Sequence, residues 1–220
     1  MKLSWLNKSG NEDLIVFFSG WSVEPEHMGF LKTDNFDIAM LHSFNSFEMP
    51  EIDMEKYKDV TVIAYSLGVF IASVLLLENK FAKEYFAING TAKPVDNNFG
   101  IRKMVFEKTL LNLSIETFDQ FQKNMFDNDA DFRRFSSSFK VTKIIAELKK
   151  ELEFIGDSCE TNVGDVSIFK KAVISKNDRI FPARNQIGFW KNCKSEVIES
   201  GHFPFYKFES WSELIKLCRK

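Results

Sequence analysis

The sequence has no apolar run of the roughly 18 residues that a membrane-spanning helix needs. Its first residues, Met1 to Trp5, lack the apolar core of a secretory signal peptide. It has only three cysteines, Cys159, Cys193 and Cys218, at spacings that match no metal-binding pattern. An odd number of widely spaced cysteines is typical of free thiols in a reducing compartment. We therefore expect a cytoplasmic protein with no membrane span, no metal and no cofactor.

The chain also lacks a large excess of charge of either sign. Its formal net charge of −2 at pH 7 gives no general attraction to nucleic acid or to an anionic membrane. No repeat and no linker rich in proline, glycine or serine interrupts the 220 residues. With 45% hydrophobic and 27% charged residues, the composition is that of an ordinary globular chain. We expect one domain, residues 1–220, acting as a monomer.

Segments that favour strands alternate with segments that favour helices. This alternation predicts an α/β fold with a mostly parallel central sheet and helices on both faces. From residue 93 to about 159 the strand segments vanish, which predicts a small helical cap, inserted after the sixth strand. The expected strands are 3–6, 14–19, 36–41, 60–64, 84–89, 172–175 and 196–199, and the clearest helices are 67–78, 141–154, 183–190 and 210–218.

Ser66 stands between a β-branched run, 60–64, and a long apolar run, 69–77. The first run is typical of a buried parallel strand and the second of a helix. A serine at such a tight strand-to-helix turn occupies the position of a nucleophile elbow. The turn needs small neighbours, and Ala64 and Gly68 are small, although most elbows have glycine where Ala64 stands. Ser66 is therefore the candidate nucleophile, or, in the simpler interpretation, an ordinary turn residue.

A serine hydroxyl needs a base to take its proton, and the base needs an acid to orient it. Asp178 and His202 each follow a predicted strand, and an open α/β sheet places its site at the carboxyl ends of its strands. The chain order Ser, Asp, His is that of α/β-hydrolases. Ser66, Asp178 and His202 are therefore the candidate catalytic triad.

Other residues compete for these roles. Asp157 and Asp165 are rivals of Asp178, which could itself be a turn residue, but neither directly follows a strand segment. His202 could be a packed core histidine. The other two histidines, His27 and His42, precede the serine, and we expect them at the surface or around the site rather than in it.

The oxyanion of an acyl-transfer reaction needs two backbone donors. One is expected from the amide of Leu67, directly after the candidate nucleophile, and the other from the loop after strand 14–18. In that loop Gly20 permits close backbone approach, so we expect the amide of Trp21 to be the second donor.

These motifs together resemble those of the α/β-hydrolase superfamily and, within it, the BioG type of pimeloyl-acyl-carrier-protein methyl ester esterases. The resemblance implies that Ser66 is the nucleophile, His202 the base and Asp178 its orienting acid. It also implies hydrolysis of pimeloyl-acyl-carrier-protein methyl ester to pimeloyl-acyl-carrier protein and methanol, in biotin synthesis. Ala64, in place of glycine, is the main departure. The resembling segments are 18–21, 64–68, 177–182 and 201–205.

An acyl carrier protein is acidic, so basic residues of the predicted cap are candidates for binding it. Basic residues outnumber acidic ones between residues 99 and 150, although an ordinary solvated helix face would also carry such charges. The candidates are Arg102, Lys103, Arg133, Arg134, Lys140 and Lys143.

Two other functions remain open at this stage. A generic carboxylesterase or thioesterase acting on short acyl groups would need the same triad, because esters and thioesters share one tetrahedral chemistry. A non-catalytic binding protein on a hydrolase fold would not need the triad, and the intact Ser-Asp-His set argues against it.

Overall fold

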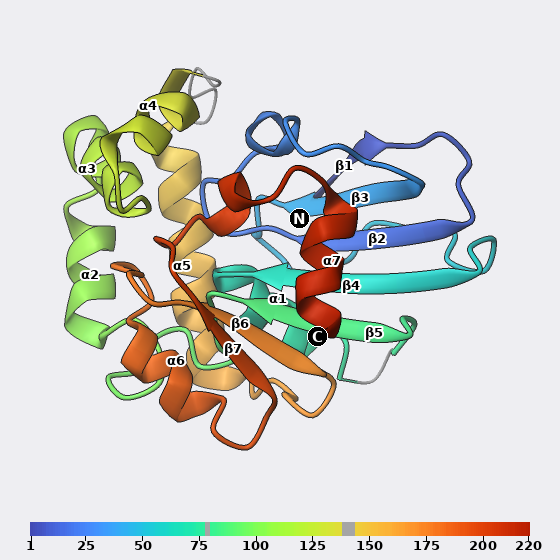
Figure 1. Cartoon of the computed structure of the whole chain (residues 1–220). Helices are drawn as coiled ribbons and strands as arrows, with labels where there is room; N and C mark the ends of the chain where they lie inside the picture. Colours follow the sequence, from blue (N-terminus) through green and yellow to red (C-terminus); the bar gives the residue numbers. More distant parts are fainter. Residues whose placement is uncertain (78–79, 138–143) are drawn as a thin grey trace.

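Figure 1 shows the protein as a computed structural model, which describes residues 1–77, 80–137 and 144–220. Within these residues, seven strands form one sheet: β1 (Lys2–Asn7), β2 (Asp13–Phe18), β3 (Phe36–His42), β4 (Asp59–Tyr65), β5 (Glu84–Ile88), β6 (Lys171–Ser175) and β7 (Ser195–Ile198). Their order is β1-β3-β2-β4-β5-β6-β7. β1 is antiparallel to β3, and all the other neighbours are parallel.

The sheet is covered by helices on both faces, because successive residues of a strand point to opposite sides. In β4, Val62 belongs to the core that includes Phe70 of α1 (Leu67–Leu75). The next residue, Ile63, belongs to the core that includes Trp211 of α7 (Trp211–Arg219). Figure 1 shows α7 in front of the sheet and α1 behind it. The predicted fold class is confirmed, and the predicted strands agree with the observed ones to within one residue at each end.

A block of helices separates β5 from β6. Because five strands precede the block, it follows the fifth strand and not the sixth, and the count made from the sequence was wrong. Figure 1 places α2, α3 and α4 beyond the carboxyl ends of the strands. The predicted helix 141–154 corresponds to the last helix of the block, which extends to Thr161, and its predicted start at 141–143 lies outside the described residues. The helices are α2 (Lys103–Leu111), α3 (Ile115–Asn124), α4 (Asp129–Ser137) and α5 (Ile145–Thr161).

Short elements connect the remaining strands. α6 (Ala183–Phe189) joins β6 to β7, and the 3-10 turns η1 (Pro25–Met28) and η2 (Pro204–Lys207) follow β2 and β7. No helix in the described parts of the chain combines the length and the apolar character that crossing a bilayer requires.

The turn from β4 into α1 is tight because two backbone segments pass very close to each other there. A Cβ atom added to Gly68 would lie 2.2 Å from the carbonyl oxygen of Ser19, at the end of β2. Only a residue without a side chain lets α1 begin at this distance from the neighbouring strand end.

We predict that Gly68→Ala lowers the free energy of unfolding by about 1–3 kcal/mol, the usual cost of forcing a methyl group into packed structure. Gly188→Ala is the matched control, because its Cβ would meet nothing closer than 3.9 Å. Replacing this glycine of helix α6 by alanine is expected to raise the free energy of unfolding by about 0.5–1 kcal/mol. Urea denaturation of both variants measures the two effects, and equal stability of the variants would contradict the prediction.

Candidate active site

Ser66 lies in the turn between β4 and α1 with φ 56° and ψ −126°. A positive φ is unfavourable for any residue with a side chain, and such strain persists only where the surroundings enforce it. Here the Ser66 amide donates to the carbonyl of Ile88 at 2.9 Å, and the Ser66 carbonyl accepts from the Val69 amide at 3.1 Å. These bonds hold the turn in the backbone conformation of a nucleophile elbow, with the Ser66 side chain at the carboxyl end of the sheet.

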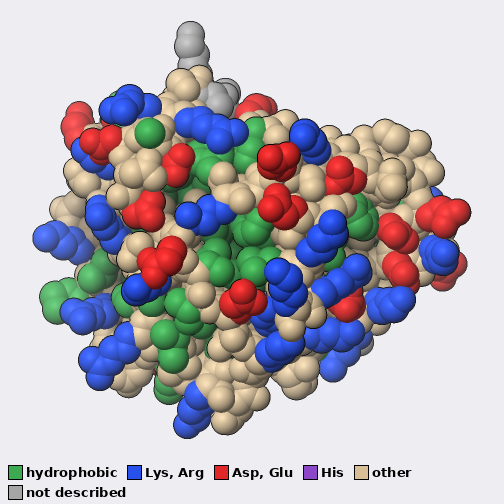
Figure 2. All heavy atoms as spheres, viewed as in Figure 1, with side chains coloured by type: hydrophobic (Ala, Val, Ile, Leu, Met, Phe, Trp, Pro, Cys, Tyr) green, Lys and Arg blue, Asp and Glu red, His purple; other side chains and the backbone are tan. Residues whose placement is uncertain are grey.

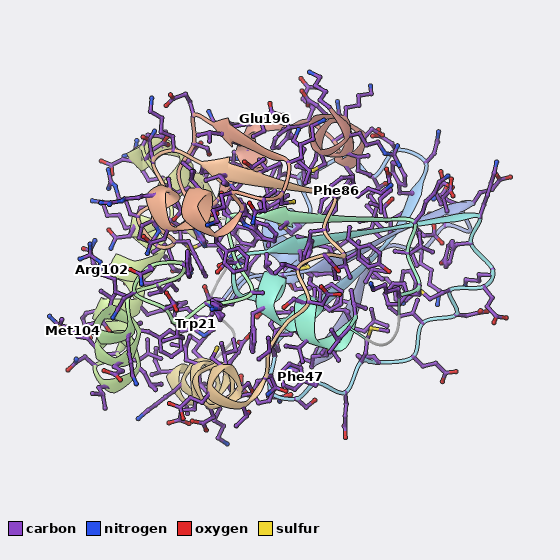
Figure 3. The ribbon with its side chains drawn as sticks, turned by 90° about the horizontal axis from the view of Figure 1, so that it is seen from below. Trp21, Phe47, Phe86, Arg102, Met104 and Glu196 are labelled. Carbon is purple, nitrogen blue, oxygen red and sulfur yellow. The ribbon has the colours of Figure 1, made fainter. Side chains whose placement is uncertain are left out.

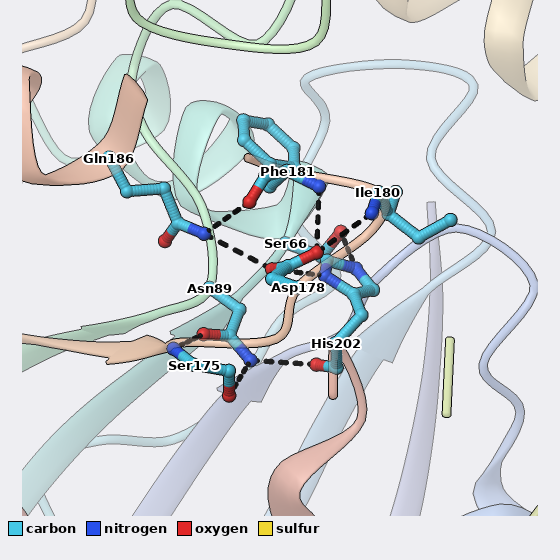
Figure 4. Close-up of polar contacts among 8 residues, drawn as sticks. All are labelled: Ser66, Asn89, Ser175, Asp178, Ile180, Phe181, Gln186 and His202. Carbon is cyan, nitrogen blue, oxygen red and sulfur yellow. Dashed lines mark hydrogen bonds and ion pairs between the residues drawn. The ribbon is translucent and has the colours of Figure 1, made fainter. Parts of the chain in front are cut away.

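The structure brings Ser66, His202 and Asp178 together, although they come from three separate loops (Figure 4). The Nε2 atom of His202 is 2.9 Å from the Oγ atom of Ser66. The Nδ1 atom of His202 is 2.7 Å from the Oδ2 atom of Asp178. All three side chains are buried. With this geometry the imidazole can take a proton from the serine while the carboxylate stabilises the resulting imidazolium.

The Asp178 carboxylate is fixed by further donors. Its Oδ1 atom accepts hydrogen bonds from the amides of Ile180 and Phe181, both at 2.8 Å. Its Oδ2 atom accepts one from the side-chain amide of Gln186 at 3.1 Å, and the same amide nitrogen donates to the Phe181 carbonyl. Gln186 is fully buried in α6 and was not identified from the sequence, where nothing distinguishes it from a surface glutamine.

Asn89, at the end of β5, holds the loop that carries His202. Its side-chain nitrogen donates to the carbonyl of His202 at 2.7 Å and to the hydroxyl of Ser175 at 2.8 Å. Its side-chain oxygen accepts from the Ser175 amide at 2.7 Å. The residue is 1% exposed and has a φ of 48°, a conformation that asparagine tolerates better than most residues. One buried amide thus joins the ends of β5 and β6 to the backbone of the candidate base.

The helical block contacts the same loop from the other side. The amide of Phe203, next to His202, donates to the carbonyl of Met125 at 3.0 Å. The ring of Phe203 also packs against Phe126 and Phe135, with centroids 5.7 and 5.2 Å apart. The position of His202 therefore depends on the segment that joins α3 to α4.

Tyr65 forms part of the wall beneath the imidazole. Its ring centroid lies 5.1 Å from that of His202. Burial raises the pKa of the Tyr65 hydroxyl well above its usual value, and the nearby Asp178 carboxylate raises it further. Tyr65 is therefore a neutral neighbour of the site at any physiological pH.

The loop expected to supply an oxyanion donor lies directly against the nucleophile turn. A Cβ atom added to Gly20 would lie 2.7 Å from the ring of Tyr65 and 3.0 Å from the Cβ of Ser66. In the part of the chain that the structure describes, neither the amide of Trp21 nor that of Leu67 has a hydrogen-bond acceptor. The Trp21 side chain is anchored separately, by a 3.0 Å hydrogen bond from its indole nitrogen to the carbonyl of Leu148 in α5.

A cavity of about 640 Å³ leads from Ser66 to the helical block. Its size and its mostly apolar lining are typical of small-ligand sites. Figure 3 shows Trp21 at the end of the sheet, on the side where Met104 of α2 and Arg102, the residue just before α2, lie. The apolar lining comprises Trp21, Leu67, Ile101, Met104, Val105, Phe106, Phe121, Leu152 and Ile180, and the polar groups include Lys108, Thr109, Asn112, Gln120 and Arg179.

The basic candidates are dispersed over the block. Arg102 and Lys103 are exposed at the start of α2, and Arg133 is exposed on α4. Arg134 is also exposed, and its guanidinium stacks over the rings of Phe30 and Tyr206, at 4.7 and 4.1 Å. Lys140 and Lys143 lie outside the described residues. Lys108 and Arg179, which were not singled out from the sequence, line the cavity.

The rival residues lie elsewhere. Asp157 is exposed on α5, and Asp165 accepts from the Ser167 amide. His27 and His42 were expected at the surface or around the site, and because both are buried the surface position is excluded. His27 of η1 stacks on Phe135 of α4, and His42 is 3.2 Å from the Glu24 carboxylate.

The described residues contain no group of three or more histidine, cysteine or acidic side chains that could hold a metal ion. The three cysteines are free.

The chain is similar to known proteins in both sequence and structure. A family model described as "Pimeloyl-ACP methyl esterase BioG" matches residues 1–214. The crystal structure of selenomethionine-labelled BioG from Haemophilus influenzae superposes with a TM-score of 0.88 at 28% identity, covering 96% of this chain and 98% of that one. A malonyl-[acyl-carrier protein] O-methyltransferase of Bacteroides fragilis is 29% identical over 84% of this chain but only 38% of its own length. An esterase from Exiguobacterium antarcticum, at 14% identity, 99% and 95% coverage and a TM-score of 0.70, shares the fold.

We predict that Asn89→Asp lowers kcat for a short p-nitrophenyl ester at least about tenfold, because losing one buried hydrogen bond costs about 1–3 kcal/mol. Aspartate keeps the side-chain oxygen that accepts from the Ser175 amide, and it tolerates the positive φ. It loses the two hydrogen bonds that the Asn89 side-chain nitrogen donates, to the Ser175 hydroxyl and to the His202 carbonyl. KM should change little, since Asn89 does not line the cavity.

Steady-state kinetics and thermal melting of Asn89→Asp and Asn98→Asp measure this effect. The control residue, Asn98, is exposed and uses its backbone amide, not its side chain, in its hydrogen bond to Asp96. A folded Asn89→Asp variant with kcat within twofold of the unsubstituted protein would show that the contact to the His202 carbonyl has no role in positioning the base.

Proposed function

Because the chain belongs to the BioG family of pimeloyl-acyl-carrier-protein methyl esterases, we propose that Ser66, His202 and Asp178 perform the hydrolysis that defines the family. The protein is a carboxylic ester hydrolase of biotin synthesis, and its substrate is the methyl ester of pimeloyl-acyl-carrier protein. The observation that supports these roles most directly is the position of one imidazole between a hydroxyl at 2.9 Å and a carboxylate at 2.7 Å.

In the first half-reaction, the Ser66 oxygen attacks the carbonyl carbon of the methyl ester, and Nε2 of His202 takes the hydroxyl proton. Asp178 holds the proton on Nδ1 and stabilises the imidazolium. The amides of Trp21 and Leu67 donate to the oxyanion, and each such donor is typically worth about 2.7–4 kcal/mol in the transition state. When the intermediate collapses, the bond to the methoxy oxygen breaks and His202 returns the proton to it, releasing methanol.

In the second half-reaction, a water molecule attacks the acyl-enzyme while His202 takes one of its protons. The collapse of this intermediate breaks the bond between the acyl carbon and the Ser66 oxygen, which recovers a proton from His202. The product keeps its thioester to the carrier protein and has a free carboxylate where the methyl ester stood.

We propose that the helices between residues 93 and 159 act as a cap over this site. The apolar cavity beneath them, about 640 Å³, suits the methylene chain of the substrate, which loses contact with water on entering it. A chain bound there would leave the thioester outside, pointing toward the carrier protein, and would present only the methyl ester to Ser66.

The carrier protein is the expected partner, and the exposed Arg102, Lys103 and Arg133 are candidates for pairing with its acidic residues. We also propose that the protein acts as a monomer in the cytoplasm. All three proposed catalytic side chains come from one chain, and the free cysteines suit a reducing compartment.

We predict that Ser66→Ala lowers the hydrolysis of methyl pimeloyl-carrier protein by a factor on the order of 10³ or more, because the variant has no nucleophile. Ser73→Ala is the matched control, since Ser73 is a buried serine of α1, the helix that follows Ser66, and its hydroxyl donates to the Phe70 carbonyl. Circular dichroism checks that both variants fold.

Turnover by Ser66→Ala within tenfold of the unsubstituted protein would refute the serine mechanism. Mass spectrometry of the carrier protein distinguishes the products: loss of the methyl group alone indicates the esterase, and release of the free carrier thiol indicates a thioesterase.

Ser66 should also react with a fluorophosphonate probe. We predict labelling of the unsubstituted protein and of Ser73→Ala but not of Ser66→Ala, because the probe reports a serine activated by a neighbouring base. In-gel fluorescence measures the labelling. Absence of labelling in a folded, unsubstituted protein would favour a non-catalytic binding role.

A further inference from the structure

The amide of Trp21, one of the two proposed oxyanion donors, belongs to a loop with a strained backbone. The next residue, Ser22, has a φ of 65°, which is unfavourable for a residue with a side chain. In the part of the chain that the structure describes, its buried hydroxyl has no hydrogen-bond partner, so its own side chain does not compensate for this conformation. Contacts of neighbouring residues must therefore hold the loop in place.

On the side of the sheet, Ser19 supplies such contacts. Its side chain is fully buried, and its hydroxyl lies 2.9 Å from the Gly20 carbonyl and 2.8 Å from the Val23 carbonyl, both of which can accept from it. The Val23 amide also donates to the Gly20 carbonyl, at 3.2 Å. The Gly20 carbonyl and the Trp21 amide belong to one planar peptide group. These bonds therefore fix the carbonyl end of that group.

The other end of the peptide group depends on the Trp21 side chain, which the helical block holds. The indole nitrogen donates to the carbonyl of Leu148 in α5 at 3.0 Å. The ring lies edge-on against Phe118 and Phe121 of α3, with centroids 5.7 and 4.7 Å away. Only 4% of Trp21 is exposed, so these protein contacts and not solvent determine where the ring lies.

α5 is a firm support because it is attached to the rest of the protein. Leu148 is buried in the core that includes Phe70 of α1. Three residues further along α5, the buried Glu151 carboxylate accepts a hydrogen bond from the Phe44 amide, just beyond β3, at 2.9 Å. The Trp21 side chain is thus bonded to a helix whose own position is fixed.

The anchoring contacts lie partly behind the cavity. Trp21 lines the cavity together with Ser66 and Leu67, on the side away from α2. Figure 2 shows hydrophobic and basic side chains side by side at the left edge of the molecule, where Figure 1 has α2. Of the two rings that touch Trp21, Phe121 lines the cavity and Phe118 does not. A change at Phe118 can therefore affect Trp21 without altering the surface that an acyl chain would contact.

We propose that the Trp21 side chain is a positioning group, which sets the direction of the Trp21 amide by attaching the loop to α5 and α3. This inference rests on the proposed function, because it takes that amide as an oxyanion donor. The carbonyl oxygen gains its full negative charge only in the tetrahedral intermediate. A misplaced donor therefore weakens the binding of the intermediate more than that of the ester. The anchor should act on kcat rather than on KM.

Trp21→Phe tests the anchor, because phenylalanine keeps an aromatic ring but cannot donate to the Leu148 carbonyl. We predict that it lowers kcat for a short p-nitrophenyl ester about tenfold, less than the roughly 10²–10³-fold effect of removing an oxyanion donor altogether. KM should stay within about threefold. Steady-state kinetics measure both constants, and thermal melting checks the fold.

Trp190→Phe is the matched control. Trp190 is 2% exposed and donates its indole N–H to the Gly90 carbonyl at 2.9 Å, but it does not line the cavity. The control removes the same kind of hydrogen bond and should keep kcat within about twofold.

Two inhibitors separate the tetrahedral state from the cavity surface. With an alkyl trifluoromethyl ketone, the Ser66 oxygen bonds to the carbonyl carbon, the hydroxyl proton passes to His202, and the carbonyl oxygen becomes an oxyanion. The methyl ketone of the same chain length occupies the cavity without this adduct. Trp21→Phe should weaken inhibition by the trifluoromethyl ketone by about the factor by which kcat falls, and inhibition by the methyl ketone at most about twofold.

Phe118→Leu disturbs the anchor from behind and should lower kcat and the affinity for the trifluoromethyl ketone in parallel, by about threefold. Phe169→Leu is its control, because the Phe169 ring meets Trp190 with nearly the same geometry. The centroid distances and interplanar angles are 5.6 Å and 80° for that pair and 5.7 Å and 81° for Phe118 and Trp21.

Folded Trp21→Phe and Phe118→Leu variants with kcat within twofold of the unsubstituted protein would overturn the positioning role. Equal weakening of the two ketones would also overturn it, because the indole would then be only a wall of the cavity.

Failure of the proposed function gives a different result. If the trifluoromethyl ketone inhibits the unsubstituted protein no better than the methyl ketone, the serine mechanism is wrong, and the inference with it. If the unsubstituted protein cleaves the p-nitrophenyl ester but not methyl pimeloyl-carrier protein, the substrate is wrong and the role of Trp21 still stands on the two ketones.

Discussion

The imidazole of His202 is the group on which the site depends, because its two ring nitrogens are hydrogen-bonded to Ser66 and Asp178, which lie in other loops. Ser66 follows β4, Asp178 follows β6 and His202 follows β7, and these strands are parallel members of one sheet. Parallel strands end at the same edge, so the three loops meet there. The strained backbone of Ser66 is tolerated because the turn is bonded to β5 on one side and packed against the end of β2 on the other.

The cavity and the proposed base, His202, depend on the same structural elements. The helical block that lines the cavity also contacts the loop of His202, through the Met125 carbonyl and the ring of Phe126. Asn89 holds the same loop from the sheet side. A displacement of the block would therefore alter both the lining of the cavity and the position of the imidazole. The helices therefore help to position the imidazole as well as lining the cavity, even though they supply none of the three proposed catalytic side chains.

Much of the fold could be predicted because its signals are local. The β-branched run before Ser66 and the apolar run after it are visible in one window of sequence, and they correspond to β4 and α1. The contributions of Gln186 and Asn89 could not be predicted, because an amide side chain has no local pattern that reveals its partner. The carbonyl of His202 is 113 residues from Asn89. Asp178 is only 8 residues from Gln186, but their contact depends on how α6 folds back onto the loop after β6. The positions of the basic side chains could not be predicted for a related reason. The sequence did not show that Arg134 stacks on aromatic rings or that Lys108 lines the cavity.

The sequence by itself determined the class of fold, the family and the identities of the three residues that could act together. Strand and helix periodicity and short turn motifs depend only on residues that are neighbours in the sequence. Only the tertiary structure decided whether those residues meet, which amides hold them and which side chains line the cavity beside Ser66. These properties depend on how the strands are ordered and how the helices pack on them. Contacts of that kind join distant segments, so no single segment encodes them.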